Sequence, residues 1–367
     1  MWLQIVLFII ALFALFAYQS HGETSLNRHR YVTFLIVLLV LQSSLRHLAV
    51  GEDTYSYSLE WIQHGAQSWS EIWQSIISVY IYGEGKDAGY AVVIKLLNYI
   101  LPSFRCFLFV YAIVLFISLF RMIERHLTSL SQIFMSFCFY QVLFYSYFSV
   151  TGMRQGMATI VTFWAIKWIQ ENKILKFTVA ILIASLIHKS VLLFLPFYFI
   201  AKFPKSKLLL TTSLLALPIL FPFARTIAIF LVNISGAEQY RMYAESEMET
   251  GGATSFLLMI LAVAVLSLYT KTKNEISIPD YVINATAMAV FFTPMMWVDT
   301  SLMRVIQYFS IFTLIGLPLA VGRLPIPPST RNLVYWGIVL VFLITMIRHN
   351  YIYGFFWEEM RLPIWYY

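Results

Sequence analysis

The sequence predicts an all-α fold, a polytopic bundle of transmembrane helices that forms a single integral membrane domain over residues 1–367. Hydrophobic residues make up 60% of the chain and charged residues only 12%, whereas a soluble domain carries about twice that charged fraction. The mean hydropathy is +0.75. Apolar runs recur along the whole chain, and a helix of about 20 apolar residues can cross a bilayer. Together these observations indicate a helical core immersed in lipid.

The lengths of the apolar runs predict about twelve spans. In chain order they are 2–18, 31–49, 103–120, 130–149, 153–169, 174–187, 190–201, 208–233, 253–270, 281–298, 303–321 and 332–347. The first has no basic leading segment and no small-residue cleavage site, so we interpret it as a span and not as a signal peptide. The sixth and seventh are short for a full crossing and are expected to form a hairpin or a bent pair.

Five prolines are expected to kink spans, and the carbonyl groups that they free must be satisfied inside the bundle or by water. They are Pro196, Pro218, Pro222, Pro294 and Pro318.

The distribution of basic residues predicts the orientation of the spans. Alternate loops each carry at least two Lys or Arg residues; these loops are 19–30, 121–129, 170–176, 202–207, 271–280 and 322–331. The positive-inside rule assigns them to the cytoplasm, and both termini then lie outside. The formal net charge of +7 is therefore explained by orientation, and no nucleic-acid partner is predicted.

The outer side receives the long segments. The largest, 50–102, is rich in Trp and Tyr, and helical spacing of apolar residues between positions 72 and 80 predicts a helix lying in the interface. Residues 88–101 are expected to form a half-buried outer helix. Residues 234–252 are acidic and end in glycines, as in a flap loop, and 348–367 form an aromatic tail. Aromatic residues at this level anchor a protein at the headgroups or stack on sugars, and the sequence leaves both uses open.

The two cysteines, Cys106 and Cys138, lie in apolar stretches and predict neither a disulfide framework nor a metal cluster. No Walker loop, zinc-protease motif or nucleophile elbow occurs in the chain. No cofactor is predicted, although adjacent carboxylates leave a divalent ion open.

Adjacent carboxylates, Glu52 and Asp53, follow the second span, with Arg46 one turn below them. They can take a proton from a sugar hydroxyl or bind a divalent ion; alternatively they form a solvated loop in which Asp53 caps the next helix. Asp87 precedes the outer helix, and an N-cap role is favoured there over catalysis. Asp299, which ends one span before the next begins, is similar.

The sharpest local signal is Thr151-Gly-Met-Arg-Gln155. Thr151 can cap the helix that follows, and this places Arg154 and Gln155 in its first turn, where free N–H groups favour an anion. The guanidinium is a planar donor suited to phosphate. An arginine opposes the helix dipole at an N-terminus, so Arg154 needs a counter-charge; the alternative is an arginine that reaches the headgroups.

Two further residues belong with Arg154. His188 lies between two short apolar helices and is either a structural residue or an acid, base or phosphate contact. Arg304 begins a span, with Tyr308 one turn later, and would supply a second positive charge for a diphosphate unless it simply pairs with Asp299. An ionised side chain in a membrane segment usually holds a partner or a substrate.

These segments, in this order, resemble the EpsG-like family of Wzy-type bacterial polysaccharide polymerases. The matching segments are Gly51-Glu-Asp-Thr-Tyr-Ser-Tyr57, Asp87-Ala-Gly-Tyr90, Thr151-Gly-Met-Arg-Gln155 with Ala158, Ala184-Ser-Leu-Ile-His-Lys-Ser190 with Pro196, and Arg304 with Tyr308. The resemblance covers about residues 45–310. Ala88 departs from the pattern, which has a proline there.

The resemblance implies a C-type glycosyltransferase architecture in the bacterial inner membrane, with the active site facing the periplasm. A growing glycan would pass from undecaprenyl diphosphate to a hydroxyl of an undecaprenyl-diphosphate-linked repeat unit. The diphosphate would be held by Arg154, Arg304, Gln155 and Arg46. The base would be Asp53, Glu52 or His188. The glycan would contact Tyr55, Tyr57, Asp87, Tyr90, Asp299 and Tyr308.

The expected partners are the lipid-linked oligosaccharide and polysaccharide, membrane lipids and a chain-length regulator protein. Two other functions remain open at this stage. A flippase for lipid-linked sugars would also need arginines, but it would line a path through the membrane with charge and often shows two repeated halves. A ligase or acetyltransferase would pass its group to a different acceptor.

Overall fold

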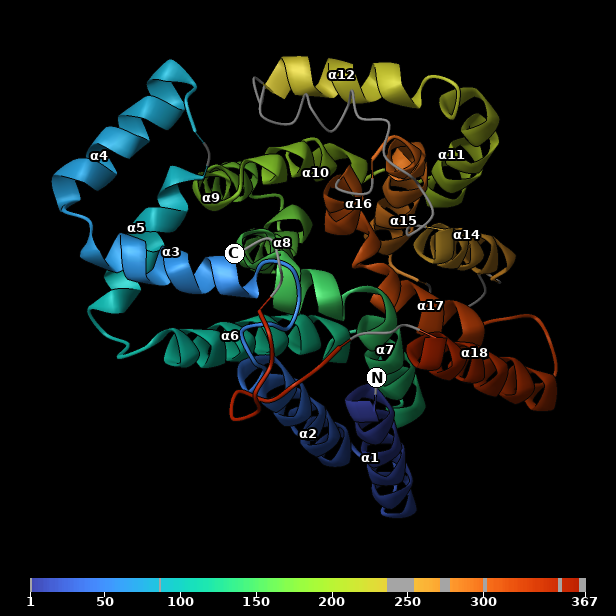
Figure 1. The fold of residues 1–367 in the computed structure, drawn as a ribbon. Coiled ribbons are helices and arrows are strands. Elements are labelled where there is room, and N and C mark those ends of the chain that lie inside the picture. The colour runs from blue at the N-terminus through green and yellow to red at the C-terminus, as the bar shows by residue number, and fades with distance from the viewer. Residues whose placement is uncertain are drawn as a thin grey trace.

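The structure, a computed structural model, describes residues 2–85, 87–235, 254–270, 278–299, 302–348 and 352–362 (Figure 1). Over these ranges all regular elements are helices, and extended pairing is limited to a bridge between Arg46 and Phe355. The predicted all-α class is confirmed. The expected flap 234–252 lies almost entirely outside the described residues, as do most of loop 271–280 and part of the tail.

The elements follow one another with short connections. The first are α1 (Trp2–Ser20), α2 (Ser25–Ser44), α3 (Thr54–Ala66), α4 (Trp69–Ile77), η1 (Ser78–Tyr82), α5 (Ala88–Asn98), α6 (Phe104–Glu124), α7 (Leu130–Leu143), η2 (Tyr145–Thr151) and α8 (Met153–Gln170). They are followed by α9 (Ile174–Ile187), η3 (Lys189–Phe194), α10 (Phe197–Ile200), α11 (Ser206–Leu220), α12 (Ala224–Ser235), α14 (Thr254–Tyr269), α15 (Asp280–Phe292), η6 (Thr293–Trp297), α16 (Met303–Ser310), α17 (Thr313–Gly322) and α18 (Pro328–Arg348).

Three described helices, α1, α6 and α18, are long and apolar enough to cross a membrane, and the number rises to six if each of three bent pairs is one span. The helix α9 has 14 residues, about 21 Å at 1.5 Å per residue, against a hydrocarbon core of about 30 Å. The structure thus fits a multi-pass membrane protein. The count of twelve spans stays a prediction, because several apolar helices are too short to cross alone.

Three of the expected spans are bent pairs of helices in the structure. Segment 130–149 bends by 63° between α7 and η2, 208–233 by 104° between α11 and α12, and 303–321 by 50° between α16 and α17. Pro218 lies inside α11, and Pro222 lies in the break that follows. A proline removes a backbone donor and crowds the preceding turn, which breaks the helix.

One proline shows how a freed carbonyl is satisfied in the bundle. Pro318 lies inside α17 and cannot donate to the carbonyl of Leu314, four residues earlier. The hydroxyl of Ser136 on α7 donates to that carbonyl oxygen instead, at 2.6 Å. The expected internal satisfaction is therefore confirmed at this position, and it joins α17 to α7.

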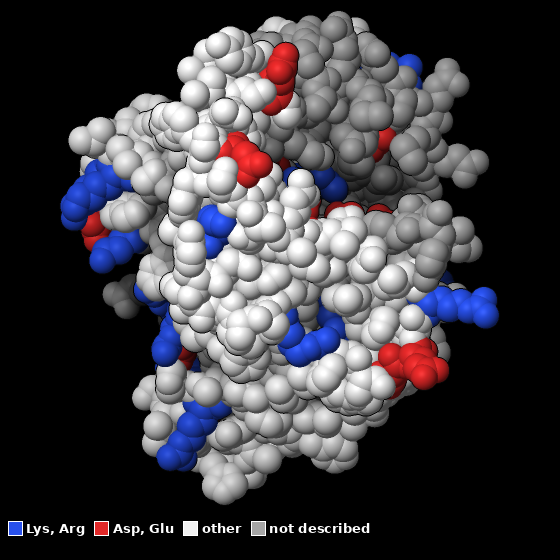
Figure 2. All heavy atoms as spheres, turned by 60° about the vertical axis from the view of Figure 1, so that its left-hand side comes forward, with Lys and Arg blue, Asp and Glu red and all other residues white. Residues whose placement is uncertain are grey.

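The helix α8 lies at the centre of the molecule (Figure 1) and packs against α6 and α9. Segment 50–102, which the sequence predicts to lie on the outer side, forms α3, α4, η1 and α5; α3 and α4 pack on α5, and α5 packs on α9. The expected half-buried outer helix is α5, in which Ile94 is buried and Leu96 is 49% exposed. Figure 2 shows one face on which basic and acidic side chains stand in small groups separated by uncharged surface.

The described part of the aromatic tail lies along the end of α2. The backbone N–H of His47 donates to the carbonyl of Gly354 at 2.7 Å, and that of Phe356 donates to the carbonyl of Leu45 at 3.0 Å. The Tyr353 hydroxyl donates to the carbonyl of Gln42 at 2.6 Å. These bonds hold the tail against the turn that leads from α2 into α3.

The contact between α5 and α9 depends on Gly89. A Cβ atom at this position would lie 2.5 Å from the carbonyl oxygen of Leu186, the residue before the last of α9. The Tyr80 hydroxyl donates to the same oxygen at 3.0 Å. Glycine thus allows the first turn of α5 to approach the backbone of α9 directly.

We expect Gly89→Ala to lower the free energy of unfolding by about 1–3 kcal/mol, because the added methyl group must displace backbone. Gly337→Ala on α18 is the matched control, since nothing lies within 4 Å of a Cβ there, and it should leave stability unchanged or raise it by up to about 1 kcal/mol. Thermal unfolding of both purified variants in detergent measures the difference. Equal stability of the two would contradict the proposed contact.

Candidate functional site

Asp87 is the centre of a buried polar cluster. Its side chain is 2% exposed, and its Oδ2 atom lies 3.2 Å from Nδ1 of His188. Its Oδ1 atom accepts a hydrogen bond from the backbone N–H of Lys189 at 3.2 Å. Asp87 has left-handed backbone angles, φ 54° and ψ 38°, and makes no side-chain capping bond to α5. The predicted N-cap role is wrong, because packing of α5 on α9 brings the carboxylate to the start of η3 instead.

Arg154 connects Asp87 to α3. One terminal nitrogen of its guanidinium, Nη2, donates to Oε1 of Glu60, and the other, Nη1, lies 3.7 Å from Oδ2 of Asp87. The guanidinium carbon is 4.8 Å from the ring centre of Tyr90 and 5.8 Å from that of Tyr57, within the range of cation–π attraction. The predicted need of Arg154 for a counter-charge is met by two carboxylates.

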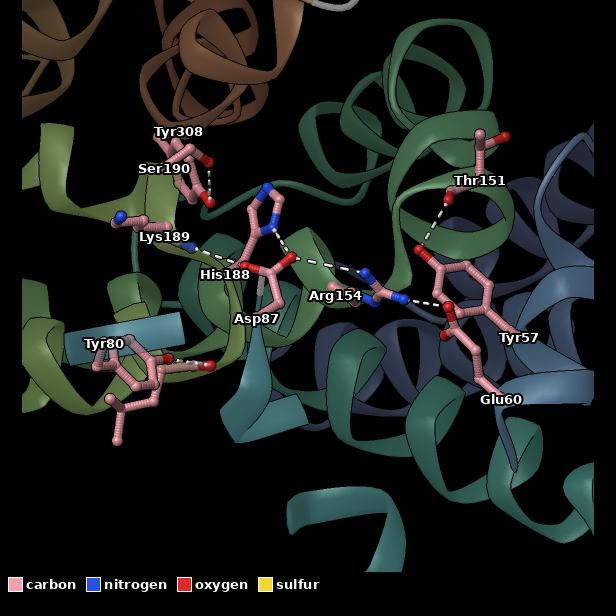
Figure 3. Close-up of polar contacts among 11 residues, drawn as sticks. Tyr57, Glu60, Tyr80, Asp87, Thr151, Arg154, His188, Lys189, Ser190 and Tyr308 are labelled. Carbon is pink, nitrogen blue, oxygen red and sulfur yellow. Dashed lines mark hydrogen bonds and ion pairs between the residues drawn. The ribbon is translucent and has the colours of Figure 1, made fainter. Parts of the chain in front are cut away.

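We call the series Glu60–Arg154–Asp87–His188 the ion chain (Figure 3). Exposure falls along it, from 24% for the Glu60 side chain and 17% for Arg154 to 2% and 5% for Asp87 and His188. The Glu60 end of the ion chain therefore reaches the surface, and the end with Asp87 and His188 is enclosed. Burial alone would raise the pKa of Asp87, but the hydrogen bond from His188 and the charge of Arg154 hold that pKa below its usual range.

The first turn of α8 is organised differently from the prediction. Gly152 and not Thr151 occupies the N-cap position, and Thr151 ends the π-helical turn η2. The N–H of Gly152 donates to the carbonyl of Tyr147. The carbonyl of Thr151 accepts from the Tyr57 hydroxyl at 3.1 Å, which joins η2 to α3. Arg154 and Gln155 lie in the first turn of α8 as expected.

The segment that contains Glu52 and Asp53 turns tightly against η2. Gly51 has φ +79°, and a Cβ there would lie 2.2 Å from a methyl carbon of Val150, so only glycine fits. Glu52 is exposed and Asp53 is half-buried. Asp53 holds the N-cap position of α3 but makes no side-chain capping bond, which contradicts the capping alternative. Burial raises the pKa of Asp53, Arg304 opposes the rise, and Glu52 adds to it.

Arg304 lies beside the first turn of α8. The side-chain nitrogen of Gln155 donates to the Arg304 carbonyl at 2.7 Å, which joins α16 to α8. Arg304 also acts on the pKa of Asp53 and Tyr57, so its charge is near both. Among the residues that the structure describes, Arg304 forms no ion pair. The three residues Arg154, His188 and Arg304, far apart in sequence, therefore meet in one region.

Tyr308 lies one turn after Arg304 and is fully buried. Its hydroxyl is 3.1 Å from that of Ser190, which follows His188 by two residues (Figure 3). Asp299 is also buried, at 1% exposure, and Tyr55 is half-buried.

Arg46 lies deeper than the other site residues. It is fully buried, and its guanidinium donates to Thr54 Oγ1 at 3.2 Å and to the backbone carbonyl of Ser43. It also approaches the sulfur of Met153 at 3.5 Å. The structure places Arg46 beneath the site as a connection between α2, α3 and α8. Its role at a diphosphate stays a prediction and would require the side chain to leave these partners.

Glu60 was not identified from the sequence. Its spacing from Asp53 and Tyr57, seven and three residues, places all three on one face of α3, and this periodicity was the available signal. The backbone N–H of Lys189 and the hydroxyl of Ser190 were also missed. No sequence pattern reports such contacts, because they depend on the bend between α9 and η3.

Four buried polar atoms of the cluster have no hydrogen-bond partner in the part of the chain that the structure describes. They are Glu60 Oε2, Tyr90 OH, Arg154 Nε and His188 Nε2. Buried polar atoms are nearly always paired in proteins, so such a group at one place needs a reason. Among the described residues no set of three or more His, Cys, Asp or Glu side chains could hold a metal ion.

The fold and this cluster define a multi-pass, all-α membrane protein with a buried ionic site at one end of its central helix. A family model described as the EpsG family matches residues 29–360. The chain therefore belongs to the EpsG family, a family of Wzy-type polysaccharide polymerases, as its motifs predicted. No curated protein and no solved structure matches the chain. Family membership suggests a polysaccharide polymerase of the glycosyltransferase type.

We expect Asp87→Asn to lower the free energy of unfolding by about 3–5 kcal/mol, because removing one member of a buried ion pair leaves its partner uncompensated. The control is Glu171→Gln, which breaks the exposed pairs of Glu171 with Lys173 at 2.6 Å and Lys167 at 3.6 Å. Exposed pairs contribute about 0–1 kcal/mol. Chemical unfolding in detergent measures the stability of both variants. If Asp87→Asn lost no more stability than Glu171→Gln, the ion chain would not stabilise the protein.

The lowered pKa of Asp87 also predicts a pH dependence of stability. A carboxylate whose pKa falls on folding stabilises the protein above its unfolded pKa, and this stabilisation is lost as the pH falls through the lower, folded value. We expect the wild-type chain to lose stability on acidification below about pH 4, the ordinary range of aspartate. The slope should be smaller in Asp87→Asn. Parallel curves for the two proteins would show that Asp87 does not contribute.

Proposed function

We propose that the chain is a polysaccharide polymerase that transfers a growing glycan from undecaprenyl diphosphate to a hydroxyl of an undecaprenyl-diphosphate-linked repeat unit. The observation that carries the proposal is the ion chain, with Arg304 and Asp53 beside it and four unpaired polar atoms around it. Membership of the EpsG family supports it.

The departing diphosphate needs positive charge where its negative charge develops. Arg304 is the first ligand in this proposal, because it forms no ion pair with a described residue and lies beside the first turn of α8. Arg154 is the second, and its two terminal nitrogens already meet Glu60 and Asp87. A direct contact with phosphate therefore involves exchange of Glu60, the more exposed of the two carboxylates. The Gln155 side chain positions Arg304, because it donates a hydrogen bond to the backbone carbonyl of Arg304.

His188 is the proposed base. A carboxylate only accepts hydrogen bonds, so the contact with Asp87 keeps a proton on Nδ1 and leaves Nε2 as the acceptor. Nε2 is buried and has no described partner. In the reaction, Nε2 takes the proton of the acceptor hydroxyl. The oxygen of that hydroxyl forms a bond to the anomeric carbon of the growing glycan. The bond from that carbon to the diphosphate oxygen breaks, and its electron pair leaves with undecaprenyl diphosphate.

The other residues that the sequence analysis assigned to the site take supporting roles. Asp53 and Glu52 border the same region and are proposed to orient the acceptor sugar; they are the alternative bases. Tyr57 and Tyr90 lie against the Arg154 guanidinium, so they hold that side chain and do not present a free face to sugar. Among the tyrosines, half-buried Tyr55 is the proposed glycan contact. Tyr308 and Asp299 are proposed to support the site from its buried side.

The proposed setting is a C-type glycosyltransferase architecture of about twelve spans in the bacterial inner membrane, with the site at the outer face. Support comes from the predicted topology, because Arg154, His188 and Arg304 lie at the expected outer end of spans, and Asp53 and Asp87 lie in the expected outer segment 50–102. Both polyprenyl chains would remain in lipid while their sugars meet. A chain-length regulator is proposed to bind the membrane helices.

We expect Arg304→Ala and Arg154→Ala to abolish long glycan ladders in cells, because each removes charge that stabilises the leaving diphosphate. Arg154→Lys, which keeps the charge but loses the two-pronged donor, should shorten ladders without reducing the amount of protein in the membrane. Arg348→Ala, at the exposed end of α18, is the control and should give normal ladders. Normal ladders in both Arg304→Ala and Arg154→Lys, at normal protein level, would refute the assignment.

Replacing the base should lower kcat and change KM little, because proton removal occurs in the transition state. We expect His188→Gln to reduce kcat by about 10²- to 10⁴-fold, measured with purified protein, lipid-linked repeat unit and two acceptors. Asp53→Asn should lower kcat less and raise KM. The opposite pattern would make Asp53 the base. Product on a foreign acceptor alone would indicate a ligase, and transport across vesicles without dimers of the repeat would indicate a flippase.

A further inference from the structure

Two adjoining cavities lie at the end of α8 opposite to Arg154. They share the lining residues Ile166, Gln170 and Tyr281. One has a volume of about 190 Å³ and is bounded by the end of α6, and the other, of about 320 Å³, is bounded by the turn after α10 and the start of α15. The helix α8 has 18 residues and is therefore about 27 Å long, so most of its length separates the cavities from its first turn. They do not belong to the ion chain.

Basic side chains from three elements line these cavities. Arg125 follows α6, Lys167 lies on α8, and Lys202 follows α10. In the described ranges, neither Arg125 nor Lys202 forms an ion pair. Their charged groups lie instead near aromatic rings, with the Arg125 guanidinium 5.8 Å from the ring centre of Trp164 and the Lys202 ammonium 3.8 Å from that of Tyr198.

The acidic side chains described at this end form no ion pair with either of those two cations. Asp280, the carboxylate in the cavity lining, accepts a hydrogen bond from the Ser206 hydroxyl at 2.7 Å. Glu171 pairs with Lys173 at 2.6 Å and with Lys167 at 3.6 Å. The two linings together hold three basic side chains, of Arg125, Lys167 and Lys202, against the one carboxylate of Asp280, an excess of positive charge.

Two uncharged polar side chains of the linings, those of Tyr281 and His126, are held by hydrogen bonds. The Tyr281 hydroxyl lies 2.8 Å from Nε2 of His126, and Nδ1 of His126 lies 2.9 Å from the Met122 carbonyl. A carbonyl only accepts, so Nδ1 donates and Nε2 accepts from Tyr281. This pair gives the smaller cavity a rigid wall between the end of α6 and the start of α15.

We propose that these cavities bind a phosphate group, carried by the headgroup of an anionic membrane lipid. Each volume far exceeds the ~30 Å³ of one water molecule, so a phosphate and its substituent fit. The lining comes from loops that the positive-inside rule assigns to the cytoplasm, and basic pockets between helices on that side bind lipid headgroups. The site would tie the ends of α6, α8 and α15 together far from the chemistry.

The test is binding of phosphatidylglycerol to the purified full-length chain in neutral-lipid nanodiscs, followed by thermal unfolding and by native mass spectrometry. We expect phosphatidylglycerol to raise Tm and remain bound, and phosphatidylcholine to do neither. Arg125→Gln with Lys202→Gln should weaken binding at least tenfold. Lys176→Gln with Lys205→Gln is the matched control, because it removes equal charge from the same end but from neither cavity lining.

Inorganic phosphate forms a second arm. A rise in Tm with phosphate alone, lost in the Arg125/Lys202 variant, would assign the site to free phosphate; no such rise would assign it to the lipid. Equal lipid binding by the two double variants would overturn the proposal, as would equal retention of phosphatidylglycerol and phosphatidylcholine. Arg125→Lys with wild-type Lys202 keeps the charge and should bind phosphatidylglycerol more tightly than the Arg125/Lys202 double variant, which separates loss of charge from loss of folding. None of these measurements depends on glycan synthesis.

Discussion

The burial of the Asp87 carboxylate is the constraint on which the arrangement of the site depends. Removing a carboxylate from water costs several kcal/mol unless charges and hydrogen bonds compensate it. His188, Arg154 and the Lys189 N–H all meet this one group. Because these partners come from α8 and from the break between α9 and η3, the positions of these elements and α5 are fixed relative to one another. The helix α3 is fixed to the same elements, because its residue Glu60 pairs with Arg154.

The backbone is irregular wherever the site requires it. The π-helical turn η2 precedes α8, and the extended residue His188 separates α9 from η3. Asp87 has a left-handed backbone conformation. Such breaks free polar backbone groups, which membrane proteins tolerate where protein or a polar cavity satisfies them. Here the freed groups bind site residues; the Thr151 carbonyl accepts from Tyr57, for example. The irregular segments and the ion chain therefore support one another.

The polar contacts below the site extend this constraint into the bundle. Arg46 joins α2 to the start of α3, and the aromatic tail pairs with the backbone beside it. The amide side chains of Gln42 and Gln141 exchange hydrogen bonds between α2 and α7, the shorter at 2.7 Å. Where water is absent, each such pair excludes alternative packings in which the groups would be unsatisfied. These contacts hold the ends of α2, α7 and α8 in fixed positions relative to one another.

The sequence by itself determined the helical class, the membrane setting, the family and the need of Arg154 for a counter-charge, because composition, apolar run length and motif order are properties of the chain alone. It did not determine which carboxylates meet Arg154. At Asp87 the local pattern is the same for a helix cap and for a buried ion pair, and the partners His188 and Glu60 lie 101 residues from Asp87 and 94 from Arg154, respectively. The bends at α7, α11 and α16 and the contact at Gly89 were likewise decided by packing. Tertiary structure alone brings such distant groups together, and only there does burial make an unpaired charge costly enough to select one pairing.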